Sequence, residues 1–217
     1  MEPDFWRERW REGRIAFHRG EPHPLLVAHC NRFAEGGRIL VPLAGKSLDI
    51  RFLLERGHEV VAVELVEDAV RAFFDDLGET PVVEERQGCP VYLGEKVTFH
   101  VADFFETTPG GLGRVDGIYD RASLVALPPA YRARYAAHLA SLAPYGSGVL
   151  MITVDYDRGQ MSGPPFSVPP SEVEAIFGGP FEVFTLDSVD GLDDNPVLRE
   201  RGLTRLGEHA LWLRRRV

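Results

Sequence analysis

The residues best suited to chemistry follow two apolar runs of the chain. The first run ends at Leu43 and is followed by Gly45, and the second ends at Glu64, 19 residues after that glycine. An acid at this spacing can accept hydrogen bonds from the hydroxyls of a ribose. An isolated glutamate often does no more than solvate a strand end. Together with Gly45, Glu64 predicts a cofactor that contains a nucleoside.

The loop after the first run does not suit a cofactor with phosphates. Its letters Gly45-Lys46-Ser47 end like a P-loop, but the earlier glycine of that motif falls at Leu40. A dinucleotide would need several glycines, so that its pyrophosphate could approach the backbone. A cofactor with ribose and adenine but without phosphate fits better, and S-adenosylmethionine is such a cofactor.

This cofactor gives each strand end an expected partner. We expect the loop around Gly45 to hold the amino-acid end and Glu64 to hold the ribose. Asp103 and Phe104 follow another apolar run and are expected at the edge and face of the adenine. In an open α/β sheet these segments would meet at the carboxyl ends of the strands.

Aromatic residues precede the first strand. Trp6 and Trp10 stand four residues apart and would share one face of a helix, and Phe17 follows them. The tryptophans could simply cover the core. Over the mouth of a sheet, they would instead form a lid that excludes water.

Two later segments favour an acceptor site. Arg121 follows a further strand and is either a surface charge or, as its position favours, a cation facing the pocket. Residues 161–169 are rigid and apolar. They are either a plain connector or a wall beside the acceptor, with Pro165 and Phe166 as the candidate contacts.

Strand and helix signals alternate along the chain, which predicts a parallel sheet with crossover helices. Helices are expected after Ser47, over 67–76, from Pro128 to about Leu142 and over 171–177, and residues 79–96 read as a loose hairpin outside the strand count. The seven expected strands are 38–43, 59–64, 97–102, 116–119, 148–154, 181–187 and 208–213.

The composition of the chain limits which ligands and partners we expect. The 217 residues carry a net charge of −9, which argues against nucleic acid. The apolar runs fall short of the ~20 residues that cross a bilayer, and the N-terminus lacks a secretion signal, so we expect a cytoplasmic protein. Two separated cysteines and scattered histidines disfavour a metal site.

We expect one domain over residues 1–217, with residues 1–30 as its lid, and we expect the protein to act as a monomer.

Taken together, these segments resemble the thiopurine S-methyltransferase family, particularly its shorter bacterial members. The resemblance implies the class I methyltransferase fold, a seven-stranded, mostly parallel Rossmann-like sheet with helices on both faces and a last strand inserted antiparallel. The matching segments are WRERWREGRIAFH, LVPLAGKSLDIRFLLERGHEVVAVEL, DFF at 103–105, YDRASLVALPPAYRARYA, and GPPFSV with Tyr156-Asp157 before it.

The resemblance also implies roles for individual residues. Asp103 and Phe104 match the adenine side, and Phe17 matches an aromatic residue near the acceptor, which Arg121 also borders. Ala44 departs from the cysteine of many relatives, but it is still small. The residues implied to contact S-adenosylmethionine are Trp10, Leu43, Glu64 and Arg121.

The expected activity is S-methylation of thiopurines or other aromatic and heterocyclic thiols. Alignment and loss of water would supply the catalysis, with Arg121 favouring an anionic acceptor and no obligatory general base. Trp6, Trp10 and Phe17 would keep the site dry. Three alternatives stay open: methylation of selenium or tellurium species, of halide or thiocyanate ions in detoxification, or a non-catalytic sensor of S-adenosylmethionine. The missing glycines count against a nicotinamide oxidoreductase.

Overall fold

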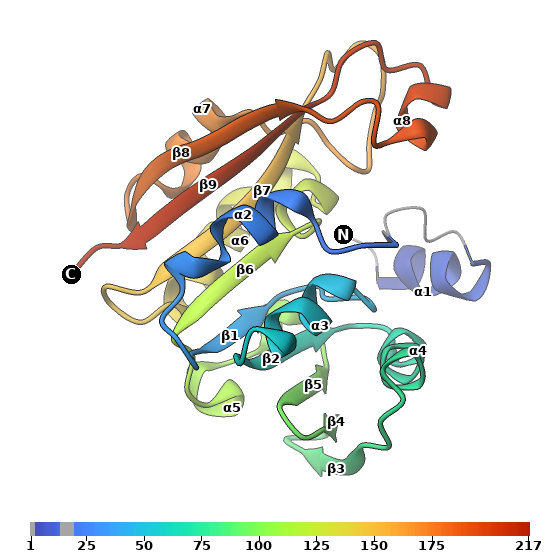
Figure 1. Ribbon diagram of the computed structural model, residues 1–217, viewed down its shortest axis with the longest axis vertical. Coiled ribbons are helices and arrows are strands. Elements are labelled where there is room, and N and C mark those ends of the chain that lie inside the picture. The colour runs from blue at the N-terminus through green and yellow to red at the C-terminus, as the bar shows by residue number, and fades with distance from the viewer. Residues whose placement is uncertain (1–2, 14–19) are drawn as a thin grey trace. The chain divides into compact units, whose positions relative to one another are not determined.

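The computed structural model describes residues 3–13 and 20–217. The chain divides after Tyr119 into two compact units. The described residues form nine strands, and Figure 1 labels them with the helices.

Parallel strands form the centre of the first unit. They are β1 (Arg38–Val41), β2 (Glu59–Glu64), β5 (Val97–Val101) and β6 (Gly117–Arg121), in the order β5-β2-β1-β6. Apolar residues of β1 and β2 are buried on both faces, as expected for parallel strands covered on each side. This explains why these strands could be predicted as continuous apolar runs.

A hairpin extends this sheet and corrects the expected strand count. Strands β3 (Val82–Arg86) and β4 (Cys89–Leu93) pair with each other, and β4 pairs antiparallel with β5. The turn between them is Gln87-Gly88, with φ of 54° and 77°. Positive φ at both positions suits a two-residue turn between twisted strands. The hairpin was predicted, but its pairing with β5 was not, so the expectation of seven strands was wrong.

Helix ends in the first unit follow local capping rules. Ser47 caps α3 (Leu48–Glu55) by accepting a hydrogen bond from the backbone N–H of Asp49 at 3.2 Å. Gly57, with φ of 88°, ends it as predicted. The other helices of this unit are α1 (Pro3–Arg11), α2 (Pro24–His29), α4 (Glu67–Leu77), α5 (Pro109–Leu112) and the short 3-10 helices η1 (Cys30–Arg32) and η2 (Phe104–Glu106).

The second unit contains an antiparallel group of strands. Its order is β7-β9-β8, so the last strand of the chain inserts antiparallel between its neighbours, as the resemblance implied. The strands are β7 (Gly148–Asp155), β8 (Phe181–Asp190) and β9 (Gly207–Arg215). The helices are η3 (Leu124–Ala126), α6 (Pro129–Leu142), α7 (Pro170–Phe177) and α8 (Pro196–Glu200).

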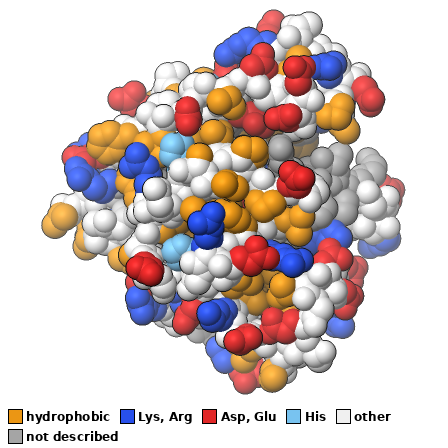
Figure 2. Space-filling model, viewed as in Figure 1, with side chains coloured by type: hydrophobic (Ala, Val, Ile, Leu, Met, Phe, Trp, Pro, Cys, Tyr) orange, Lys and Arg blue, Asp and Glu red, His pale blue; other side chains and the backbone are white. Residues whose placement is uncertain are grey.

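Acidic, basic and apolar side chains are interspersed over the face shown in Figure 2. Within the described part of the chain, none of the helices combines the length and apolar character needed to cross a membrane.

Candidate cofactor and acceptor sites

Glu64 joins the ends of two neighbouring strands in the first unit. Its Oε2 accepts the backbone N–H of Gly45 at 2.7 Å, and its Oε1 accepts that of Val66 at 2.8 Å. The side chain lies at the carboxyl end of β2 and is 7% exposed. The two residues that were predicted to form the centre of a cofactor site are therefore in direct contact.

Burial raises the pKa of the Glu64 carboxyl above its ordinary value, and the backbone N–H groups of Val66, Gly45 and Leu65 oppose that shift. A carboxylate offers about four acceptor positions, so these N–H groups leave room for further donors. Ribose hydroxyls are donors of this kind. The arrangement can therefore hold the β1 loop and a nucleoside at the same time.

The loop after β1 has an unusual backbone. Leu43 has φ of 46°, and Gly45 has φ of 54°. A positive φ is unfavourable for leucine, and such strain gathers at ligand sites. The loop is also tied to β2, because the N–H of Ala44 donates to the carbonyl of Val63 at 3.0 Å. This loop is thus built to bring backbone N–H groups close to Glu64.

Lys46 has a partner within the first unit. Its ammonium group lies 2.8 Å from Asp76 Oδ2, at the end of α4. The lysine of the P-loop-like letters is therefore engaged with an acid of the protein. This agrees with the interpretation that the loop is not a phosphate site.

The predicted adenine segment lies beside Glu64 but differs in detail. The backbone N–H of Ala102 donates to the Glu64 carbonyl at 2.9 Å, and Asp103 caps η2 through the N–H of Phe105 at 2.9 Å. Asp103 is exposed, whereas Phe104 is only 4% exposed. The Phe104 ring therefore belongs mainly to the core. Its role beside adenine stays a prediction.

The tryptophans of the expected lid lie on helix α1. Trp6 and Trp10 are both half-buried, and Trp6 packs edge-on against Phe5, with 5.3 Å between ring centroids. Arg9 lies over both Phe5 and Trp6. Phe17 lies outside the described residues. The lid itself stays a prediction.

The chain after this segment is anchored through a buried acid that the sequence did not reveal. Asp49 is 1% exposed. Its Oδ1 accepts the backbone N–H of His23 at 2.7 Å, and its Oδ2 accepts the hydroxyl of Tyr119 at 2.9 Å. His23 is therefore hydrogen-bonded to the first turn of α3, directly after the loop of Gly45.

In the second unit, the end of β6 combines a buried acid with a half-buried base. Asp120 is fully buried and accepts the Tyr135 hydroxyl at 2.7 Å and the Leu124 N–H at 3.3 Å. Arg121 follows it and is half-buried. Ala122 then has φ of 61°, a second strained backbone position beside a predicted site residue. Asp120 thus orders the turn that follows Arg121 at the end of β6.

Burial raises the pKa of Asp120 to about 6, against opposing hydrogen bonds from Tyr135 and Leu124. The native state therefore binds more protons than the unfolded state between about pH 4 and pH 6. Stability from this group is present at low pH and is lost as the pH rises through that window. Across this window the free energy of unfolding should change by up to ~3 kcal/mol because of Asp120. We expect Asp120→Asn to remove this dependence on pH, as measured by urea unfolding. The exposed Asp193→Asn should keep the slope, and an unchanged slope in Asp120→Asn would contradict the assignment.

The proposed acceptor wall contacts η3, which follows Arg121 in the chain. The backbone N–H of Phe166 donates to the carbonyl of Val125 at 2.6 Å. The Tyr156 hydroxyl donates to the carbonyl of Pro165 at 2.5 Å. Pro165 and Phe166 are both half-buried. The structure thus links the two segments that were predicted to face the acceptor.

Comparison with known proteins identifies the family. The family model for thiopurine S-methyltransferase (TPMT) matches residues 1–216. The thiopurine S-methyltransferase of Pseudomonas fluorescens (strain Pf0-1) is 43% identical over 216 residues, which cover 99% of each chain. That of Shewanella sp. (strain ANA-3) is 42% identical over 219 residues and 100% of each chain. The chain belongs to the thiopurine S-methyltransferase family. This membership confirms the predicted enzyme class, a methyltransferase that uses S-adenosylmethionine.

Solved structures confirm the fold class. Burkholderia thailandensis 1,6-didemethyltoxoflavin-N1-methyltransferase, with bound 1,6-didemethyltoxoflavin and S-adenosylhomocysteine, matches with a TM-score of 0.67 at 20% identity, over 99% of this chain and 87% of that one. A SAM-dependent methyltransferase from Methanosarcina mazei matches with a TM-score of 0.64 at 13% identity, over 91% and 99%. At these identities the likeness concerns the fold alone.

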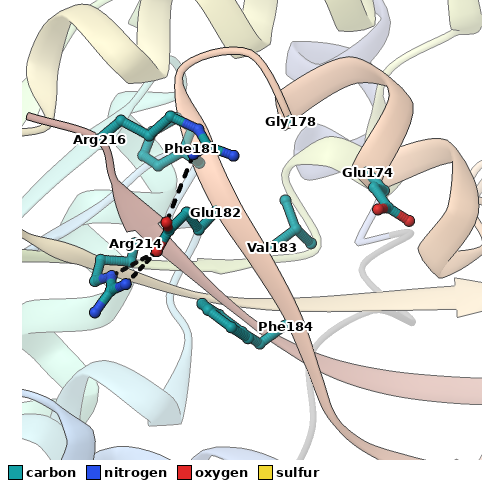
Figure 3. Close-up of a pocket in the computed structure, with 8 residues that line it drawn as sticks. All are labelled: Glu174, Gly178, Phe181, Glu182, Val183, Phe184, Arg214 and Arg216. Carbon is teal, nitrogen blue, oxygen red and sulfur yellow. Dashed lines mark hydrogen bonds and ion pairs between the residues drawn. The ribbon is translucent and has the colours of Figure 1, made fainter.

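The second unit of this thiopurine S-methyltransferase family member has a pocket whose lining includes none of the predicted site residues. Figure 3 shows Glu182 pointing toward two arginines, with its Oε2 2.8 Å from Arg214 Nε and its Oε1 3.5 Å from Arg216 Nη1. Glu182 therefore pairs with both arginines of this pocket. The lining residues are Glu174, Gly178, Phe181, Glu182, Val183, Phe184, Arg214 and Arg216.

Proposed function

We propose that the protein methylates the sulfur of aromatic or heterocyclic thiols, thiopurines among them. The observation that carries the cofactor part is the contact between the Glu64 carboxylate and the Gly45 backbone, which would put a ribose acceptor beside a loop that lacks the glycines a pyrophosphate needs. The acceptor part is supported by the link between the loop of Arg121 and the wall at Phe166. Family membership supports both parts.

S-adenosylmethionine, when bound, would supply a methyl group on a sulfonium. An acceptor thiolate would displace this methyl group in line, with S-adenosylhomocysteine as the leaving group. Glu64 would hold the ribose, and the backbone near Gly45 and Leu43 the amino-acid end. Arg121 would favour the anionic thiolate, whose proton has already gone to solvent. Trp6, Trp10 and Phe17 would keep water away, and Phe166 with Pro165 would align the acceptor for attack on the methyl group.

The test is transfer of labelled methyl groups from S-adenosylmethionine to a panel of acceptors. We expect turnover of a thiopurine and of thiophenol, with the label on sulfur by mass spectrometry. Transfer only to selenite, tellurite, iodide or thiocyanate would replace the proposed acceptor. Tight binding of S-adenosylhomocysteine with no transfer to any acceptor would support the sensor function instead.

Domain organisation, location and oligomeric state complete the proposal. We infer a single methyltransferase domain that acts as a cytoplasmic monomer, with residues 1–30 as a lid. Light scattering of the purified protein, with and without S-adenosylhomocysteine, tests the monomer. A mass of twice the chain's 24.2 kDa would contradict it.

A further inference from the structure

A buried arginine in the second unit contacts the acceptor wall. Arg132 lies in the first turns of α6 and is only 1% exposed. A buried guanidinium is costly unless its donors are paired. Arg132 Nε donates to the carbonyl of Leu127 at 3.1 Å, and its Nη1 pairs with Glu172 of α7. The energetic cost of its burial is therefore offset by contacts on two sides.

The same guanidinium lies against the aromatic ring of the wall. Its central carbon is 5.9 Å from the centroid of the Phe166 ring, which is within cation–π range. Gly163 contacts the same ring, since a Cβ at that position would lie 2.5 Å from Phe166 Cδ1. The Phe166 ring thus packs against the Arg132 guanidinium and against the backbone of Gly163.

A second arginine extends this network to the next residue. Glu172 also pairs with Arg158, and Arg158 donates to the carbonyl of Ser167 at 3.2 Å. Arg132 thus contacts the ring of Phe166, and Arg158 contacts the backbone of Ser167. Both arginines are held by Glu172. Only arginine combines a planar face for a ring with several fixed donors, so lysine at position 132 would keep the charge but lose part of this geometry.

We propose that Arg132 is a positioning residue for the acceptor, and that it sets the preference for flat aromatic thiols by fixing the Phe166 ring. The inference rests on the proposed thiol methylation. A fixed aromatic face favours a planar acceptor that packs against it. A small aliphatic thiol has no such face, and it gains little from the orientation of Phe166.

The experiment compares thiophenol with 2-mercaptoethanol as acceptors at saturating S-adenosylmethionine. For Arg132→Met we expect kcat/KM for thiophenol to fall about tenfold, mainly through KM, while the value for 2-mercaptoethanol changes less than about twofold. Arg132→Lys should recover part of the loss. Arg134→Met, at an exposed arginine of the same helix, should behave like the unaltered protein.

A double variant separates positioning from general stability. Phe166→Leu should lower the thiophenol preference similarly, and Arg132→Met should add nothing further once the ring is gone. Equal losses for both thiols, or losses that multiply in the double variant, would overturn the inference. If Arg132→Met does not fold, Glu172→Gln carries the same comparison. If the unaltered protein methylates neither thiol, the proposed function fails together with this inference.

Discussion

Replacing Glu64 by glutamine should weaken the binding of S-adenosylhomocysteine about 50-fold in isothermal titration. Hydrogen bonds to a charged carboxylate contribute about 1.5–3 kcal/mol, and the ribose hydroxyls would lose that acceptor charge. The amide NH2 would also oppose the N–H of Gly45 or Val66, both of which now donate to the carboxylate. The cofactor loop should therefore loosen as well.

Two controls separate these effects. Glu59→Gln changes an exposed glutamate at the other end of the same strand and should leave affinity unchanged. A 2′-deoxy analogue of S-adenosylhomocysteine should show a smaller loss in Glu64→Gln, because the missing hydroxyl has no partner to lose. Affinity of Glu64→Gln within about twofold of the unaltered protein would refute the ribose assignment.

Replacing Arg121 by methionine should lower kcat/KM for an acidic aromatic thiol about 100-fold at neutral pH. Methionine keeps much of the side-chain length but removes the cation, so the site no longer favours the thiolate over the thiol. The pH profile of kcat, which reports the bound acceptor, should accordingly shift to higher pH, because the bound thiol must ionise without help from the cation.

The affinity for S-adenosylhomocysteine must be measured beside these rates, since the family resemblance also implies a cofactor contact for Arg121. A matched control is Arg199→Met, which removes a half-exposed arginine that is paired with Asp193 on the surface. If Arg121→Met leaves both the profile and kcat/KM unchanged while cofactor affinity holds, Arg121 has no electrostatic role.

The contacts around Glu64 were largely predictable because strand register decides them. Parallel strands buried on both faces read as apolar runs, and their carboxyl ends must meet at one edge. The register pairs Glu64 with Val101, and this places Asp103 near the acid. The contact between Glu64 and Gly45 follows instead from the register of β1 on β2, which pairs Val41 with Ala62. The sequence suggested ribose rather than a backbone N–H as a partner of the acid.

Contacts between distant residues could not be predicted in this way. Arg132 meets Glu172 at a separation of 40 residues, and Tyr119 meets Asp49 at a separation of 70. A buried charge looks like a surface charge in a polar stretch such as AYRARY. The hairpin at 79–96 was missed as part of the sheet for a related reason, since its exposed β3 lacks the apolar run of a buried strand.

The most direct test of the cofactor site is a crystal structure with bound S-adenosylhomocysteine. We expect the ribose hydroxyls within about 3 Å of the Glu64 carboxylate, the amino-acid end on the loop of Leu43 and Gly45, and the adenine beside Asp103. A nucleoside bound elsewhere, with Glu64 still contacting only backbone N–H groups of the protein, would contradict the assignment.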